Sequence, residues 1–263
     1  MRQSMDLPVE HWYPAIFQRR SRRVYLQESP AEDALSRLDE VCREFRPFPG
    51  ARAQLVRCSP EAVFKGLVGR YGRVSGALLY IAFIGEMGSP RVQEATGYTG
   101  EGLILEATAL GLATCWVGGF FRPEEVRSHI AVGKGEHVLS VTPVGYAPHA
   151  KTGQEKLMSG LVGAQSRRPL AGLVRGKIAA PWMVKALEAA RLSPSARNRQ
   201  PWRFRIEKGT IVIAVDRALS LSSISKRLDC GIAMLHLELG ALAAGVRGRW
   251  EILSAPDVAR FSL

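Results

Sequence analysis

The chain has 263 residues, of which 46% are hydrophobic and 23% are charged, the composition of an ordinary globular protein. The longest apolar stretch, residues 76–85, is too short to cross a bilayer, and no segment is typical of an export signal. The formal net charge of +12 favours a partner that carries negative charge, either a nucleic acid or an anionic cofactor or substrate.

The basic residues and the cysteines narrow these classes further. Arginines gather only in short, scattered clusters, and no nucleic-acid-binding motif accompanies them, so we expect no nucleic-acid partner. No CxxC pair is present, which argues against a metal site, and unpaired thiols favour a reducing cytoplasm. The four cysteines lie far apart, at Cys42, Cys58, Cys115 and Cys230.

The first 150 residues predict helices that alternate with buried strands. The run over residues 97–113 is apolar on most faces, which predicts a helix at the centre of a core. Residues 77–84 are short, apolar and flanked by glycine, which is typical of a fully buried strand. Apolar spacing and a Pro with acidic neighbours predict further elements, namely helices over 31–45 and from Arg122 onwards, and a strand over 138–146.

A polar crossing segment, residues 151–176, separates this first half from a second half at 177–263. It is rich in Gly, Lys and Arg and shows little periodicity. The second half predicts a helix, a hairpin, a second apolar helix and a last strand, over residues 182–192, 202–206 with 210–215, 231–245 and 250–253.

The two halves share an internal repeat. Adding 134 to a residue number carries the glycines and apolar residues of 97–111 onto those of 231–245. The same offset carries Trp116 onto Trp250 and the apolar run 77–81 onto 211–215. One helix could match another by chance, but a strand, a helix and a Trp in one register indicate a tandem duplication. We therefore predict an α+β fold with mixed sheets, in which two central helices pack together in one shared core.

Arginines dominate the first candidate site segment, Arg19-Arg20-Ser21-Arg22-Arg23. Guanidinium groups stay charged and bind phosphate through two hydrogen bonds, so this cluster could clamp a phosphate. A solvated basic helix end is the alternative.

Two further segments carry candidate ligands. Residues 193–202 combine two prolines with Ser, Asn and Gln, which suits a rigid turn that offers donors and acceptors to a planar heterocycle. Its alternative is a plain loop between a helix and a strand. In residues 113–120, Gly118 and Gly119 would let backbone N–H groups approach a ligand, or would simply end a strand. The counterpart at Trp250 lacks these glycines.

Together these segments resemble the FMN-dependent nitroreductase family, in a single-chain duplicated form that covers about residues 14–253. The matching motifs are Arg19-Arg20-Ser21-Arg22-Arg23, Ser193-Pro194-Ser195 with Asn198 and Gln200-Pro201-Trp202, Gly111-Leu112 with Trp116 and Gly118-Gly119, and Ser166-Arg167-Arg168-Pro169-Leu170. Family members are usually homodimers with FMN at the subunit interface. The resemblance therefore implies a nitroreductase-like pseudo-dimer that binds one FMN per chain, and we expect a monomer.

The resemblance also implies which residues contact FMN. Arg19 and Arg167 would hold the phosphate, and Arg23 would lie near flavin N1 and O2. The amides of Gly118 and Gly119 would approach N5. The full expected set of cofactor-binding residues is Arg19, Arg20, Ser21, Arg23, Arg70, Gly118, Gly119, Arg167, Arg168, Pro194, Ser195, Ala196, Asn198 and Gln200.

The implied activity is hydride transfer from NAD(P)H through FMN to a nitroaromatic, a quinone or a similar small electrophile. No side chain need be a strong acid or base, because the cofactor carries the redox chemistry. Gly118 stands where many members have Glu, and Gln165 where some have Lys, so nicotinamide handling and substrate choice stay open. An FMN-binding protein without external turnover, or one that consumes the flavin, is the alternative.

Overall fold

A computed structural model describes residues 6–64, 74–150, 166–219 and 223–263. Its helices are α1 (Val9–Gln18), α2 (Glu32–Glu44), α3 (Glu61–Phe64), α4 (Val92–Ala109), α5 (Pro123–His129), α7 (Pro181–Arg191) and α8 (Lys226–Leu242). Its strands are β1 (Ala51–Val56), β2 (Leu79–Glu86), β3 (Ala113–Thr114), β4 (Glu136–Gly145), β5 (Val174–Arg175), β6 (Trp202–Glu207), β7 (Thr210–Val215), β8 (Arg249–Ile252) and β9 (Asp257–Ser262). Each predicted helix and strand has a counterpart, while α1, α3, β1, β3, β5 and β9 were not predicted.

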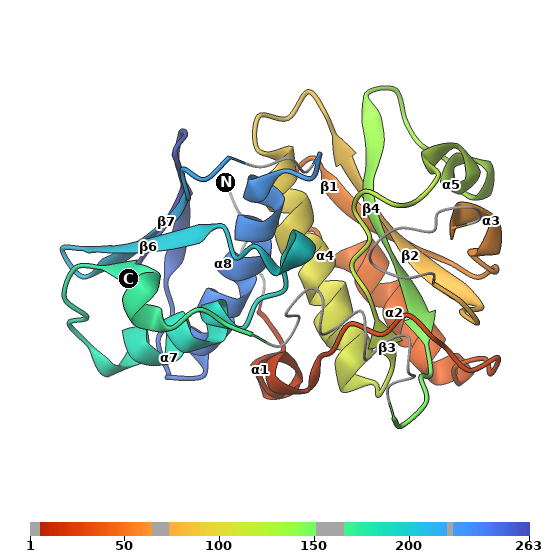
Figure 1. Cartoon of the computed structure of the whole chain (residues 1–263), viewed down its shortest axis with the longest axis horizontal. Coiled ribbons are helices and arrows are strands. Elements are labelled where there is room, and N and C mark those ends of the chain that lie inside the picture. Colours follow the sequence, from red (N-terminus) through yellow and green to blue (C-terminus); the bar gives the residue numbers. More distant parts are fainter. Residues whose placement is uncertain (1–5, 65–73, 151–165, 220–222) are drawn as a thin grey trace.

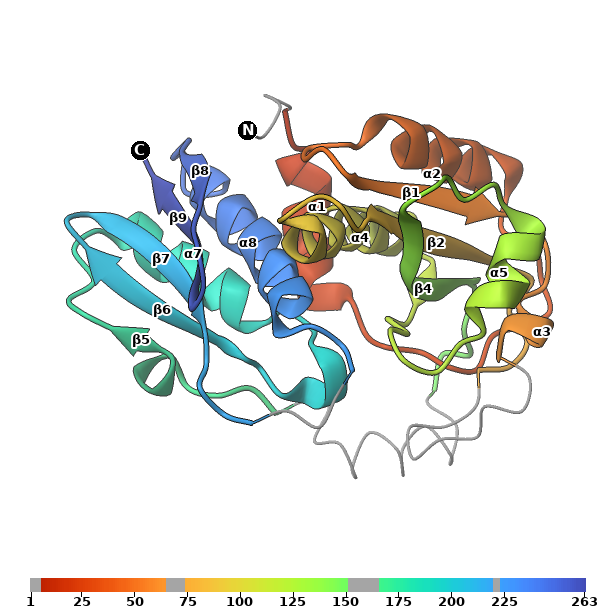
Figure 2. The ribbon, with the colours of Figure 1, turned by 90° about the horizontal axis from the view of Figure 1, so that it is seen from above.

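Two sheets flank a central pair of helices, α4 and α8 (Figures 1 and 2). The first sheet has the strand order β1-β2-β4-β3, with antiparallel neighbours throughout. The second has the order β5-β6-β7-β9-β8, in which β5 is parallel to β6 and the rest are antiparallel. Apart from β5, the two halves therefore repeat one strand order, as an α+β fold with one mixed sheet.

The repeat offset differs between helices and strands. Helix α4 begins at Val92 and α8 at Lys226, which is the expected separation of 134. In the sheets, however, Ala51 pairs with Gly85 and Trp202 with Val215, so β2 and β7 are 130 residues apart. The predicted match of strand 77–81 to 211–215 is therefore wrong by four residues. The cause is a longer connection between strand and helix in the second half, residues 216–225 against 87–91.

Two glycines let the central helices cross at backbone contact. A Cβ added at Gly97 would lie 2.0 Å from the backbone oxygen of Leu228, and one added at Gly231 would lie 2.1 Å from that of Glu94. The two contacts exchange under the offset of 134, so the crossing has the local symmetry of a twofold axis. The predicted packing of these helices is confirmed. Nearly all residues of both are buried, as expected for helices apolar on most faces.

One hydrophobic cluster extends through both halves. It joins Trp12 of α1 and Tyr98 of α4 to Met234 of α8 and Phe261 of β9. A charged contact supports the crossing at its end, where Arg227 donates to the buried carboxylate of Glu94 at 2.7 Å. The halves thus share a core that neither could complete alone.

The helix crossing generates a stability prediction. Gly97→Ala should lower the free energy of unfolding by about 3 kcal/mol or more, because the added methyl group would meet a backbone oxygen that cannot rotate away. Gly88→Ala is the matched control, since no atom lies within 4 Å of a Cβ there. Denaturant unfolding of both variants measures the difference, and equal midpoints would contradict the close crossing.

Candidate active site at the seam between the halves

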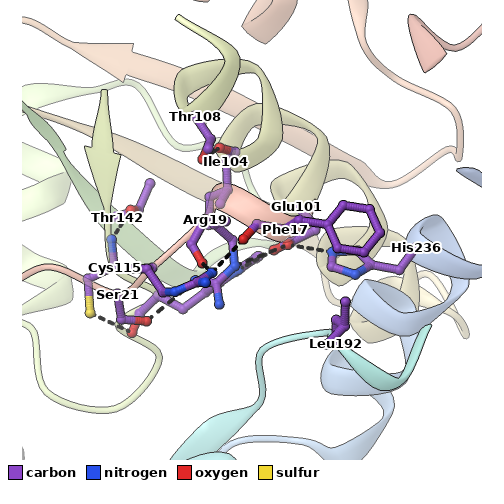
Figure 3. A network of polar contacts seen from close by, with 12 residues as sticks. Phe17, Arg19, Ser21, Glu101, Ile104, Thr108, Cys115, Thr142, Leu192 and His236 are labelled. Carbon is purple, nitrogen blue, oxygen red and sulfur yellow. Dashed lines mark hydrogen bonds and ion pairs between the residues drawn. The ribbon is translucent and has the colours of Figure 1, made fainter. Parts of the chain in front are cut away.

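Arg19 is a buried arginine with few partners. It follows α1, and only 6% of its surface is exposed. Its Nη1 donates to Ser21 Oγ at 3.5 Å, and its Nε has no hydrogen-bond partner among the described residues. Burial lowers the pKa of Arg19, and the carboxylate of Glu101, whose Oε1 lies 4.0 Å from Nε, opposes that shift. Figure 3 shows Arg19 between Ser21 and Glu101. A buried charge with spare donors is suited to an anion.

Arg167, in the last part of the crossing segment, lies near this charge. Burial, followed by the nearby positive charges of Arg19, Arg20 and Arg191, lowers the pKa of Arg167 to about 10. Its Nη1 donates to Asn198 Oδ1 at 3.0 Å. The structure therefore gathers guanidinium groups from the start of the chain and from the last part of the crossing segment. A dianion placed among them would relieve their mutual repulsion.

The turn that carries Asn198 has an unusual backbone. Arg197, Asn198 and Gln200 have φ angles of +55°, +53° and +49°, in the left-handed region that non-glycine residues seldom adopt. Ser195 Oγ accepts a hydrogen bond from the N–H of Gln200 at 2.9 Å, which closes the turn. Such strained backbone gathers at functional sites and persists only where its surroundings hold it.

Asp229, in the first turn of α8, holds this turn. Its Oδ1 accepts from the N–H of Ala196 at 3.1 Å, and its Oδ2 accepts from Arg199 Nε at 2.8 Å. Burial raises the pKa of Asp229 to about 6, against the opposing effect of Arg199. Asp229 was not among the predicted site residues. A carboxylate just before the predicted apolar helix 231–245 was the available signal, but its partners are distant in sequence.

Gln200 connects the last part of the crossing segment to the turn. Its side-chain oxygen accepts from the N–H of Arg168 at 2.8 Å, and its Nε2 donates to the backbone oxygen of Ser166 at 3.3 Å. Asn198 Nδ2 donates to the same oxygen at 2.9 Å. Both amides thus position the Arg167 backbone. Pro194 is buried beside them.

The glycine pair lies where the halves meet. A Cβ at Gly118 would come within 3.1 Å of Ile224, a residue of the longer second-half connection. Arg199 Nη2 donates to the backbone oxygen of Ile224 at 2.9 Å, which links Gly118 to the turn. On the other side, the N–H of Arg22 donates to the oxygen of Thr114 at 2.9 Å. The three predicted segments are therefore joined through Thr114 and Ile224.

Two of the predicted cofactor-binding residues, Arg70 and Arg23, add little to the geometry of the site. Arg70 lies outside the described residues. The backbone oxygen of Arg23 accepts from the N–H of Ser75 at 2.9 Å, which ties the arginine segment to the start of the strand region. Sequence reasoning also missed Glu101 and His236, fully buried polar residues within the two apolar helices.

In the described part of the chain, no group of three or more His, Cys, Asp or Glu residues could hold a metal ion. Within the same residues, no helix combines the length and the apolar character that crossing a membrane requires. The site is thus defined by arginine donors and a strained polar turn.

The fold and site define an α+β protein with two similar halves and a basic seam between them. A family model described as "Putative TM nitroreductase" matches residues 11–241, and the chain belongs to this nitroreductase family. Membership of this family supports the assignment of the chain as an oxidoreductase. No match is found among curated proteins.

One solved structure shares the fold over nearly the whole chain. A "putative nitroreductase" from Thermotoga maritima MSB8 has a TM-score of 0.66 at 20% identity, with 98% of this chain and 96% of that chain covered. A nitroreductase family protein from Clostridium difficile 630 has a TM-score of 0.45 at 19% identity, covering 66% and 100%. A nitroreductase with bound FMN from Bacteroides fragilis NCTC 9343 has 0.43 at 19%, covering 56% and 92%. The first of these confirms the predicted nitroreductase-like fold.

Asp229 generates a pH prediction. Its folded-state pKa of about 6 lies above the ordinary 3.8, so the folded chain binds this proton more tightly than the unfolded chain. The resulting stability is present below the ordinary pKa and is lost as the pH rises through about 6. Asp229→Asn cannot titrate, so its free energy of unfolding relative to wild type should rise by roughly 3 kcal/mol between about pH 4 and about pH 7. A difference that stays constant with pH would disprove the assignment.

Proposed function

We propose that the chain binds one FMN at the seam and works as an NAD(P)H-dependent oxidoreductase on nitroaromatics, quinones or similar small electrophiles. The observation that carries this proposal is the cluster of Arg19, Arg20 and Arg167 beside the strained turn at Asn198. Membership of the nitroreductase family supports it independently.

The residues present fit the phosphate of FMN. Arg19 is almost fully buried, its Nε has no hydrogen-bond partner among the described residues, and its Nη1 makes a long hydrogen bond of 3.5 Å to Ser21. Arg167 is half-buried among like charges. A phosphate accepts several charge-assisted hydrogen bonds and would neutralise this cluster. We assign Arg19 and Arg167 to the phosphate, with Arg20 and Ser21 beside them.

The remaining residues suit the flavin ring. Pro194, Ser195 and Asn198 lie on a turn whose shape is fixed by Asp229, so they would present a preformed edge rather than one that orders on binding. Gly118 and Gly119 would leave their side of the ring open to a close backbone approach. Arg23 would contribute positive charge near N1 and O2.

Bound FMN would supply the two-electron chemistry, taking a hydride from NAD(P)H and passing it to the electrophile. The chain's own residues bind and orient the cofactor and set the charge around it. Both halves of the site come from one chain, so we propose that a monomer is complete.

The phosphate assignment predicts a specific loss. Arg19→Ala should weaken FMN binding about 10- to 100-fold, because a charge-assisted hydrogen bond contributes ~1.5–3 kcal/mol. Riboflavin lacks the phosphate, so its affinity should change little. Flavin fluorescence titration measures both. Arg247→Ala is the matched control, since this arginine is 79% exposed and pairs with Asp6. Equal losses for both flavins would refute the phosphate role.

The oxidoreductase assignment predicts a colour change. The FMN-loaded protein should be yellow and should bleach when NADH or NADPH is added without oxygen, and a nitroaromatic or quinone should then restore the colour. The visible spectrum records each step. A protein that stays yellow with either nucleotide would instead be a flavin-binding protein without this turnover.

A further inference from the structure

Glu101 is a buried carboxylate whose two oxygens are each engaged. It lies on α4 with no exposed surface. Trp116 Nε1 lies 2.7 Å from Oε2 and donates to it. His236 Nε2, from α8 in the other half, lies 2.8 Å from Oε1. Figure 3 shows His236 and Arg19 on opposite sides of Glu101. These contacts hold Glu101 Oε1 4.0 Å from Arg19 Nε, too far for a hydrogen bond.

The contacts of His236 fix how many protons the pair carries. Its Nδ1 lies 3.1 Å from the backbone oxygen of Ala189, which can only accept, so Nδ1 carries a hydrogen. The contact between Nε2 and Glu101 Oε1 then requires one more proton between them. That proton belongs either to an imidazolium beside a carboxylate or to a carboxylic acid beside a neutral imidazole. In both forms the pair has no net charge.

This charge balance matters for Arg19. A carboxylate with a full negative charge beside Arg19 would compete with an incoming anion for the same guanidinium. With the added proton, the negative charge of Glu101 is balanced within the pair, so it opposes the positive charge of Arg19 less than a lone carboxylate would. Cys115 is the other titratable group that acts on Arg19, and it is buried. The neutral pair thus leaves the arginine cluster free to attract phosphate.

We infer that Glu101 and His236 are positioning residues that form a buried, proton-sharing pair, and that this pair keeps Arg19 available for the phosphate of FMN. The inference rests on the proposed function. Through His236, helix α8 would take part in phosphate binding, although no residue of α8 would touch the phosphate.

The test compares FMN with riboflavin in four proteins, by fluorescence titration of the full chain. His236→Gln keeps a donor toward Glu101 but cannot carry the extra proton, which leaves a negative charge beside Arg19. The ratio of FMN to riboflavin affinity should fall about tenfold, because the added negative charge on Glu101 would repel a phosphate bound at Arg19 inside the protein. Glu101→Gln alone leaves the pair neutral, so its ratio should stay within about twofold of wild type. The double variant is neutral again and should restore the ratio.

Glu238→Gln is the matched control. Glu238 is also a buried carboxylate at the helix crossing, and it accepts from Trp250 Nε1 and from the hydroxyl of Tyr98, each at 2.7 Å. It is not among the charges that act on Arg19. Its loss should leave the flavin ratio unchanged, even if stability falls.

The outcomes separate the two proposals. If wild type binds FMN no better than riboflavin, the phosphate site itself is wrong. If wild type prefers FMN through Arg19 but His236→Gln keeps the preference, or adding Glu101→Gln to His236→Gln fails to restore it, the inference about the pair is wrong. Equal losses of affinity for FMN and riboflavin, without rescue in the double variant, would show that the pair has a purely structural role. That outcome would also overturn the inference.

Discussion

The backbone contact between α4 and α8 is the constraint on which the site depends. Gly97 and Gly231 allow each helix to reach the carbonyl oxygens of the other, so side chains one or two turns along can bridge the seam. The hydrogen bonds from Tyr98 to Glu238 and between His236 and Glu101 each cross between halves at less than 3 Å. With larger residues at the crossing the axes would separate, and these groups would be buried without partners.

The buried carboxylates give the crossing a register. Glu101 and Glu238 each accept a hydrogen bond from a Trp of their own half and are hydrogen-bonded to a side chain of the opposite helix. Two purely apolar helices could slide along each other with little change in buried surface. A slide of α4 along α8 would instead leave two buried carboxylates without their hydrogen-bond partners. The energetic consequence is asymmetric, because removing a partner from a buried charge costs more than the intact pair contributes. Specific alignment, more than added stability, is what these residues supply.

Local sequence patterns predicted most of the helices and strands but not the contacts between distant residues. The apolar helices and the hairpin follow from periodicity, and the helix offset of 134 follows from repeated glycines. The strand β1 was missed because Pro49 and Gly50 indicate only a turn, although its burial alternates over most of its length as in a half-buried strand. The strand offset was misjudged since the longer connection before α8 shifts the register by four residues. Asp229 and His236 could not be assigned, because their partners are brought near only by the fold.

The difference between the halves explains why we propose one site in a molecule with two similar parts. The longer connection of the second half places Ile224 against Gly118, and Arg199 ties that connection to the strained turn. The shorter connection of the first half, residues 87–91, leaves no equivalent segment to reach across. The first half in turn supplies Arg19 and Arg20, which the second half lacks in its sequence after the crossing segment. Each half thus contributes a part that the other lacks, which is why we propose that the cluster of positive charge and the polar turn form one site within a single chain.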